Sequence, residues 1–227
     1  MTALRIIVPA RGGSKRLPGK NIRSLGGLSL LGWTLRTLRS AGIDQLPVLS
    51  TDDEAIAEEG RRLGYAVPFL RPAALGGDET PTLDVVLHAL DYSASHGEPE
   101  PDLVMLLQVT SPFRSPALLT EGIARMTADP GADALIAVKP LHVGLANVYS
   151  ADGPYLSCVA AAGGAGYVPS GALYISRAGA LRETASFVPP RCLFLSHDGL
   201  ETLDIDTEDD WMIAQAALAA GRISLPQ

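Results

Sequence analysis

Short apolar runs alternate with longer amphipathic stretches along most of this 227-residue sequence. Continuous apolar runs of this length are typical of strands in a parallel sheet that helices cover on both faces. The pattern predicts strands at 4–8, 46–50, 103–108 and 134–138. It predicts helices at 29–41, 54–63, 82–94, 116–127 and 211–220. We therefore expect an α/β fold that forms a single domain over residues 1–227, with its ligand at the carboxyl edge of the sheet.

The pattern changes between Pro140 and Pro169, where several glycines divide the chain into short segments. Such a stretch favours a β-rich excursion or dimer arm over another strand–helix unit. Regular structure resumes with the apolar run 171–175, and a last predicted strand, 201–205, leads into the closing helix.

Polar residues follow three of the predicted strands, at 9–11, 50–53 and 108–111. Because the carboxyl ends of parallel strands meet at one edge of a sheet, we expect these residues to converge on one rim.

The first of these strand ends opens into a loop, residues 8–21, that carries four cations and three glycines. It holds two of the three lysines in the protein, and no Asp or Glu occurs anywhere between residues 1 and 43. Glycine-rich turns let backbone N–H groups approach phosphate oxygens, and a helix N-terminus that follows adds partial positive charge. The loop therefore predicts an anion-binding site.

The composition limits what that anion can be. The net charge of −7 argues against nucleic acid as a partner of the general surface, so a small anion is expected. Cys158 and Cys192 match no metal spacing and suit a reducing compartment, which favours the cytoplasm, and the four histidines have no ligand spacing either. No apolar run approaches the roughly 20 residues of a membrane span, so we expect no membrane association.

The loop is not a Walker A motif, because five residues rather than four separate Gly13 from Gly19 and Asn21 stands where Ser or Thr would hold magnesium. Instead it resembles the signature of the acylneuraminate cytidylyltransferases, also called CMP-sialic acid synthetases. The alternative is a basic, solvated loop. The resemblance implies that CTP is bound here, with Lys20 near the α-phosphate, by Ala10, Arg11, Gly12, Lys15, Lys20 and Asn21.

Two further segments resemble parts of the same family. Arg71 and the segment 78–82 resemble its base-recognition segment, which implies that Arg71, Thr80 and Thr82 read cytosine. A guanidinium suits the O2 and N3 acceptors of that base. For the two threonines, capping of the following helix is an equal alternative.

The strand-end segment 108–114 resembles the family motif Gln-x-Thr-Ser-Pro-Leu-Arg. Arg114 in it either binds substrate or pairs with a helix carboxylate. The resemblance also places Lys139 near the carboxylate of the sugar acid, while Ser170 replaces the usual asparagine of the acid pocket. The implied sugar-acid residues are Gln108, Thr110, Ser111, Lys139 and Tyr174, with Ser111 also shaping the turn.

Asp204 and Asp206 are two residues apart, so on a strand they would share one face and could share one hard cation. The same pair is the magnesium site of the family, whereas the alternative is a helix cap. Asp209 and Asp210 fall in the first turn of the closing helix, where negative side chains interact favourably with the positive end of the helix dipole. We expect both to be structural.

The resemblance implies a three-layer α/β/α nucleotidyltransferase fold with a mostly parallel, Rossmann-like sheet, and a homodimer in which residues 140–169 reach the other subunit's site. It implies transfer of CMP from CTP to a sialic acid-like 2-keto-3-deoxy sugar acid, with Mg²⁺ and with Arg11, Lys20, Asp204 and Asp206 as the catalytic residues. No side chain stands out as a general base. The alternatives are another acceptor, such as pseudaminic, legionaminic, ketodeoxynononic or octulosonic acid, or a nucleotide-binding protein without catalysis.

Overall fold

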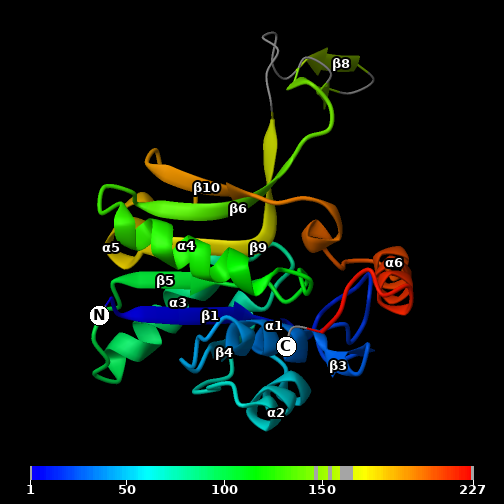
Figure 1. Ribbon diagram of the computed structural model, residues 1–227. Helices are drawn as coiled ribbons and strands as arrows, with labels where there is room; N and C mark the ends of the chain where they lie inside the picture. The colour runs from blue at the N-terminus through cyan, green and yellow to red at the C-terminus, as the bar shows by residue number, and fades with distance from the viewer. Residues whose placement is uncertain (1, 146–147, 153–154, 159–165, 226–227) are drawn as a thin grey trace.

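The computed structural model describes residues 2–145, 148–152, 155–158 and 166–225. A six-stranded sheet forms its centre, in the order β10-β6-β9-β5-β1-β4 (Figure 1). The strands β1, β4 and β5 are parallel to one another, as are β6 and β10, whereas β9 lies antiparallel between β5 and β6. The expected mostly parallel sheet is confirmed. Its strands are β1 (Leu4–Pro9), β4 (Val48–Ser50), β5 (Leu103–Leu106), β6 (Ala134–Pro140), β9 (Tyr167–Arg177) and β10 (Cys192–Ser196).

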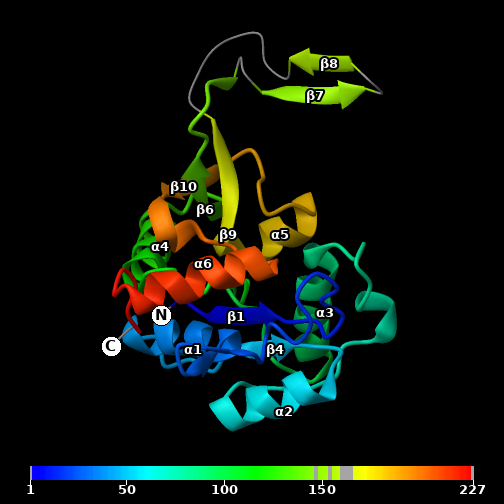
Figure 2. The same cartoon turned by 90° about the vertical axis from the view of Figure 1, so that its right-hand side faces the viewer.

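Helices cover both faces of this sheet, which gives the three layers that the sequence predicted (Figure 2). Helices α1 (Leu30–Ser40) and α4 (Pro116–Ala128) lie on one face, and α3 (Thr82–Ser95) and α5 (Ala178–Thr184) lie on the other. Strand β1 supplies both cores, because Ile6 and Val8 belong to the first apolar cluster and Ile7 to the second. Helix α2 (Glu54–Leu63) packs against α1 beyond β4.

Local signals explain where the helices begin and end. Asp53 caps α2 by accepting from the Ile56 N–H at 3.0 Å, and Gly64 ends that helix at a φ of 101°. Helix α6 (Glu208–Ala219) begins with a capping box in which Thr207 and Asp210 exchange hydrogen bonds. The structural role expected for Asp210 is therefore confirmed.

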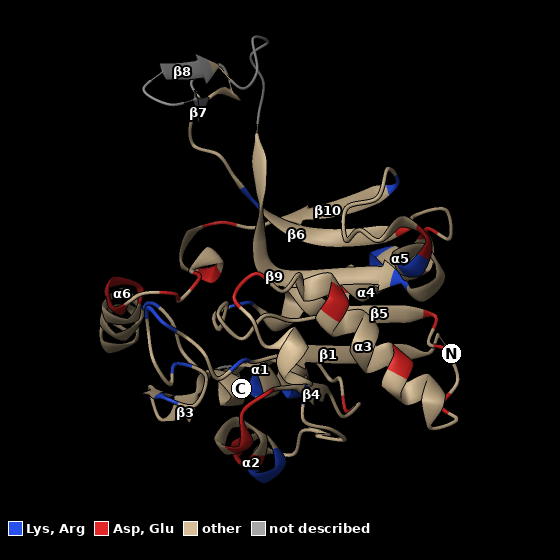
Figure 3. Cartoon of the chain, turned by 180° about the vertical axis from the view of Figure 1, so that it is seen from behind, with Lys and Arg blue, Asp and Glu red and all other residues tan. Residues whose placement is uncertain are grey.

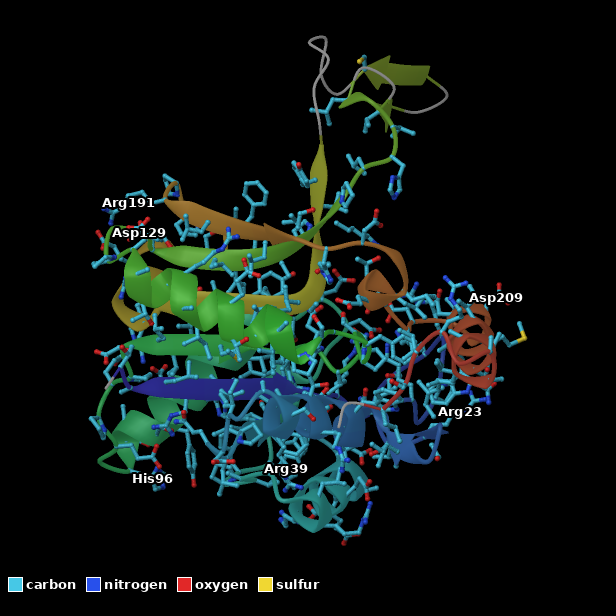
Figure 4. All side chains as sticks on the ribbon, viewed as in Figure 1. Arg23, Arg39, His96, Asp129, Arg191 and Asp209 are labelled. Carbon is cyan, nitrogen blue, oxygen red and sulfur yellow. The ribbon has the colours of Figure 1, made fainter. Side chains whose placement is uncertain are left out.

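Helix α6 docks on the short hairpin formed by β2 (Ser24–Leu25) and β3 (Leu28–Ser29). Arg23, labelled in Figure 4, lies 4.3 Å from the ring centroid of Trp211 and pairs with Glu208 at 2.8 Å. These contacts bring the segment before α6 close to the loop after β1.

The excursion is β-rich, as predicted. Strands β7 (Tyr149–Asp152) and β8 (Tyr155–Cys158) form an antiparallel hairpin that projects away from the body of the molecule (Figures 1 and 2). Residues 146–147, 153–154 and 159–165 of this stretch lie outside the described part of the chain.

The predicted strand 201–205 is wrong. A 3₁₀ helix, η3 (Gly199–Thr202), is followed by an extended segment that joins no sheet. Strand β10 already occupies the edge beside β6. The segment instead meets the turn after β5, where the Ile205 N–H donates to the Thr110 carbonyl at 2.7 Å. The sequence pattern also missed α5 and β10.

No helix among the described residues is long and apolar enough to cross a bilayer.

Candidate active site

A pocket of about 380 Å³ opens beside the carboxyl ends of β1 and β5. The strand ends converge there as expected, since the Ala10 N–H donates to the Ser50 carbonyl at 3.0 Å. Basic loop residues and acidic residues before α6 meet at this edge (Figure 3). The predicted site residues that line the pocket are Ala10, Arg11, Lys20, Asn21, Arg71, Thr80, Thr82, Gln108, Thr110, Asp204 and Asp206.

The loop after β1 is held in place by a buried amide and by a close backbone contact. Asn21 is almost fully buried, and its Nδ2 donates to the Arg11 carbonyl at 2.8 Å. The Gly12 N–H donates to Asp52 Oδ1 at 3.1 Å. A Cβ added at Gly12 would lie 2.5 Å from Asp53 Oδ2, so only glycine allows this approach. Gly12 thus lies behind the pocket wall and fixes the loop against the end of β4.

Lys20 joins the loop to the acidic segment before α6. Its Nζ lies 2.5 Å from Asp206 Oδ1 and donates to the Ile205 carbonyl at 3.1 Å. Arg16 lies 2.6 Å from the other oxygen of Asp206. The Lys20 side chain is 11% exposed and that of Arg16 is 67% exposed, so Lys20 lies inside the pocket and Arg16 at its rim. Burial opposes ionisation of Asp206, but Lys20 and Arg16 outweigh it and lower the pKa of this carboxyl group.

Arg11 and Lys15 share a second carboxylate. Arg11 Nη1 lies 2.5 Å from Asp78 Oδ1, and Lys15 Nζ contacts Asp78 Oδ2. Asp78 precedes Thr80 and Thr82, so this contact ties the loop to the segment that resembles the base-recognition segment.

Asp204 and Asp206 lie on the pocket wall on either side of the buried Ile205. Burial, followed by the charge of Asp206, raises the pKa of Asp204, although a hydrogen bond from the Thr110 hydroxyl opposes the shift. Asp204 Oδ1 is buried and has no hydrogen-bond partner among the residues that the structure describes. A carboxylate in this state gains from a bound cation.

The donor set therefore fits Mg²⁺. In nucleotide enzymes this ion is usually held by one or two carboxylates, with phosphate oxygens and water in the other positions. Within the described ranges no three His, Cys, Asp or Glu side chains form a group that could hold a metal. Asp204 and Asp206 would thus need substrate oxygens to complete the coordination.

Replacing Asp204 with asparagine is expected to stabilise the ligand-free protein by about 1 kcal/mol at pH 7, because the variant removes a buried, poorly compensated charge. The pKa of Asp204 is raised in the folded state, so the gain is full above that pKa. It disappears as the pH falls toward the unfolded value of about 3.9. Urea unfolding of both proteins at neutral and acidic pH measures this. A variant that is less stable at pH 7 contradicts the prediction.

Arg71 and two threonines form another part of the pocket lining. The Arg71 side chain is buried and donates from Nη2 to Asp52 Oδ1 at 3.2 Å. Helix α3 begins at Thr82, and its N-cap is Pro81, which makes no side-chain capping bond. The capping alternative for Thr80 and Thr82 is therefore wrong, and both residues line the pocket.

Gln108 and Thr110, which follow β5, also line the pocket. A Cβ added at Gly171, whose φ is 78°, would lie 2.5 Å from Gln108 Oε1, so this backbone position leaves room for the Gln108 amide. Ser111 is fully buried and donates to the Ser170 carbonyl at 3.2 Å. The observed contact of its hydroxyl is with strand β9 rather than with the pocket.

Lys139 and Tyr174 lie outside the lining of this pocket. Tyr174 packs against Phe187 with ring centroids 5.4 Å apart, and burial raises the pKa of its phenol. Ser170 Oγ lies 2.7 Å from His197 Nε2. Sequence reasoning did not select His197, because the spacing of the histidines matches no ligand pattern.

Arg114 takes neither of the two roles considered for it. It is almost fully buried, and burial lowers the pKa of its guanidinium to about 10. It donates from Nη2 to the Gln108 carbonyl and from Nη1 to the Thr34 hydroxyl at 3.4 Å. Arg114 therefore supports the backbone of Gln108 from inside the core.

A family model described as cytidylyltransferase matches residues 5–148, which is more than half of the chain. The chain belongs to this family. The chain is 30% identical to CMP-N,N'-diacetyllegionaminic acid synthase of Legionella pneumophila, over 96% of this chain and 97% of that protein. It is 36% identical to pseudaminic acid cytidylyltransferase of Campylobacter jejuni, but this match covers only 51% of the chain and 49% of the relative. It is also 33% identical to N-acylneuraminate cytidylyltransferase A of Danio rerio, over 60% of the chain and 30% of the relative.

Solved structures agree with the fold of this cytidylyltransferase. A CMP:2-keto-3-deoxy-manno-octonic acid synthetase complexed with CTP superimposes with a TM-score of 0.69 at 18% identity, covering 97% of this chain and 100% of the other. The 4-diphosphocytidyl-2C-methyl-D-erythritol synthase of Anaerococcus prevotii gives a TM-score of 0.67 at 17% identity, covering 96% and 99%. The expected nucleotidyltransferase fold is thereby confirmed.

Sequence reasoning selected no role for three residues that hold the site of this cytidylyltransferase together: Arg16, Asp52 and Asp78. Arg16 belongs to the cationic loop, and Asp52 belongs to a polar strand end that the sequence did mark. Their partners are more than 15 residues away in the chain, so no local pattern could have paired them.

Proposed function

We propose that this cytidylyltransferase transfers CMP from CTP to the anomeric hydroxyl of a nine-carbon or similar 2-keto-3-deoxy sugar acid. The observation that carries the proposal is the 2.5 Å contact between Lys20 and Asp206, because it places the cationic loop and the carboxylate pair in one pocket. A single triphosphate can therefore reach both. The similarity to a legionaminic acid synthase over nearly the whole chain supports a sugar acid as acceptor.

In the proposed reaction the acceptor oxygen forms a bond to the α-phosphorus, and the bond from that phosphorus to the bridging oxygen of pyrophosphate breaks. Lys20 neutralises charge on the α-phosphate, while Arg11 and Lys15 hold the departing pyrophosphate. The acceptor proton passes to solvent. Catalysis then rests on positioning and on charge stabilisation, which together can lower a barrier by several kcal/mol.

Asp204 and Asp206 would hold Mg²⁺ in this proposal, and the bound ion would withdraw electron density from the α-phosphate as a Lewis acid. Thr110 orients Asp204 through its hydroxyl, and Lys20 orients Asp206. Both carboxylates would thereby be positioned before the nucleotide arrives.

The acceptor would lie on the side of Gln108 and Thr110, with Lys139 and Tyr174 farther out. We further propose a homodimer in which the arm built by β7 and β8 approaches the partner's site, and a cytoplasmic location that suits the two separated cysteines. Size-exclusion chromatography coupled to light scattering tests the dimer directly.

Pyrophosphate release tests the whole proposal. The protein is incubated with CTP and Mg²⁺ and with neuraminic, legionaminic, pseudaminic, ketodeoxynononic or octulosonic acid in separate reactions. Release with one acid identifies the acceptor. If the protein binds CTP but releases pyrophosphate with none of these acids, the result would instead favour a nucleotide-binding protein without catalysis.

A further inference from the structure

We propose that Asp78 occupies the position of the terminal phosphates of CTP and must leave when the nucleotide binds, so that it sets the affinity for polyphosphate ligands. The inference rests on the proposed function, because it takes CTP as the ligand. It concerns a residue that belongs neither to the catalytic set nor to the carboxylate pair.

The Asp78 carboxylate binds two cations of the cationic loop that follows β1. Arg11 Nη1 lies 2.5 Å from Asp78 Oδ1, and Lys15 Nζ contacts the second oxygen. Arg11 and Asp78 both line the pocket, so the pair lies in the pocket itself. The hydrogen bond from Lys15, with the two positive charges, lowers the pKa of Asp78 and keeps it ionised at neutral pH.

Asp78 and a triphosphate cannot use these two cations together. Both ligands are anionic, and placing them side by side brings like charges within a few ångström of each other. A triphosphate carries several negative charges and the carboxylate only one, so the nucleotide wins the exchange. The exchange reduces the net gain from binding the terminal phosphates.

Asp206 makes a similar pair of contacts with Lys20 and Arg16, but its role differs. A metal ion would bind Asp206 and keep it next to the phosphates. No comparable cation is proposed for Asp78, so this carboxylate has to move away. Its displacement would also shift Thr80, two residues along the same pocket wall.

The displacement predicts a dependence on phosphate number. If Lys20 holds the α-phosphate, Arg11 and Lys15 meet only the phosphates beyond it. CMP would then leave Asp78 in place, whereas CTP and free pyrophosphate would displace it. Asp78 would therefore weaken the hold on pyrophosphate and assist its release after each turnover.

Calorimetry with the Asp78→Asn variant tests this. CTP, pyrophosphate and CMP are titrated separately into the wild-type protein and the variant at low ionic strength, without acceptor. We expect CTP and pyrophosphate to bind about threefold to tenfold more tightly to the variant, since partly exposed ion pairs contribute little each and the nucleotide no longer has to displace them. CMP affinity stays unchanged, and the difference for CTP narrows as salt is added.

Glu79→Gln is the matched control, because it removes the same charge from the exposed neighbouring residue. It should leave all three affinities unchanged. If Asp78→Asn binds CTP no more tightly than the wild type, or if its affinity for CMP rises as much as its affinity for CTP, this inference is overturned but the proposed function is not. Failure of the wild-type protein to bind CTP overturns the proposed function as well.

A second measurement covers the case in which Asp78→Asn folds poorly. Lys15→Met is introduced into the wild-type protein and into Asp78→Ser or Asp78→Asn. The loss of CTP affinity that Lys15→Met causes should be larger in the Asp78 variants, because Asp78 no longer neutralises Lys15 there. Equal losses in the two backgrounds overturn the inference.

Discussion

Replacing Lys20 with alanine is expected to lower kcat by at least about 100-fold. Lys20 is the most buried cation of the loop and the one whose Nζ reaches the carboxylate pair. Removing it would leave charge on the α-phosphate without its neutralising partner as pyrophosphate departs. Pyrophosphate release at saturating CTP and acceptor measures the loss.

Folding should change far less than turnover. Asp206 is partly exposed and keeps its contact with Arg16, so the melting temperature of Lys20→Ala should fall by no more than about 4 °C. Lys15→Ala is the matched control, because the Lys15 side chain is 81% exposed. It should mainly raise KM for CTP. If Lys20→Ala turns over at the wild-type rate, the loop takes no part in the reaction.

Replacing Asp206 with asparagine is the second change with a large expected effect. It removes one of the two carboxylates proposed for Mg²⁺, and a metal at a reacting phosphate contributes several kcal/mol, which corresponds to at least about 100-fold in rate. The midpoint of the Mg²⁺ titration should also move to higher concentration. Initial rates measured across a range of Mg²⁺ concentrations give both quantities.

CTP binding separates this effect from a general loss of the site. Asp206→Asn frees Lys20 and Arg16 from their carboxylate, so CTP should bind the variant at least as tightly as the wild type when Mg²⁺ is absent. Asp209→Asn is the control: Asp209, labelled on α6 in Figure 4, is exposed and outside the pocket lining. An unchanged Mg²⁺ titration in Asp206→Asn would contradict the assigned metal site.

The sequence predicted the parts of the fold whose causes are local. The bounds 54–63 for α2 agree with the structure because Asp53 and Gly64 mark its two ends. Strand β10 escaped detection because its burial is interrupted, with Phe194 half exposed. The direction of β9 depends on pairing with β5 and β6, which no local pattern contains.

The same division holds for the site. The spacing of Asp204 and Asp206 placed both carboxylates on one wall although the predicted strand is wrong, because an extended segment alternates its side chains as a strand does. The burial of Arg114 and the contact of Asp78 with two loop cations depend on tertiary packing. Sequence reasoning therefore named much of the lining of the pocket but not the ion pairs that close it.

The reversed direction of β9 has a consequence for how acceptor preference can change among related proteins. Because β9 runs against its neighbours, its first residues, around Ser170 and Gly171, reach the edge where β5 and β6 end. The loop proposed for the triphosphate leaves β1, which is separated from β9 by β5. With the acceptor placed as we propose, substitutions at the start of β9 would remodel its side of the pocket while the loop proposed for the triphosphate stays intact, so one scaffold would accept new sugar acids without losing its nucleotide.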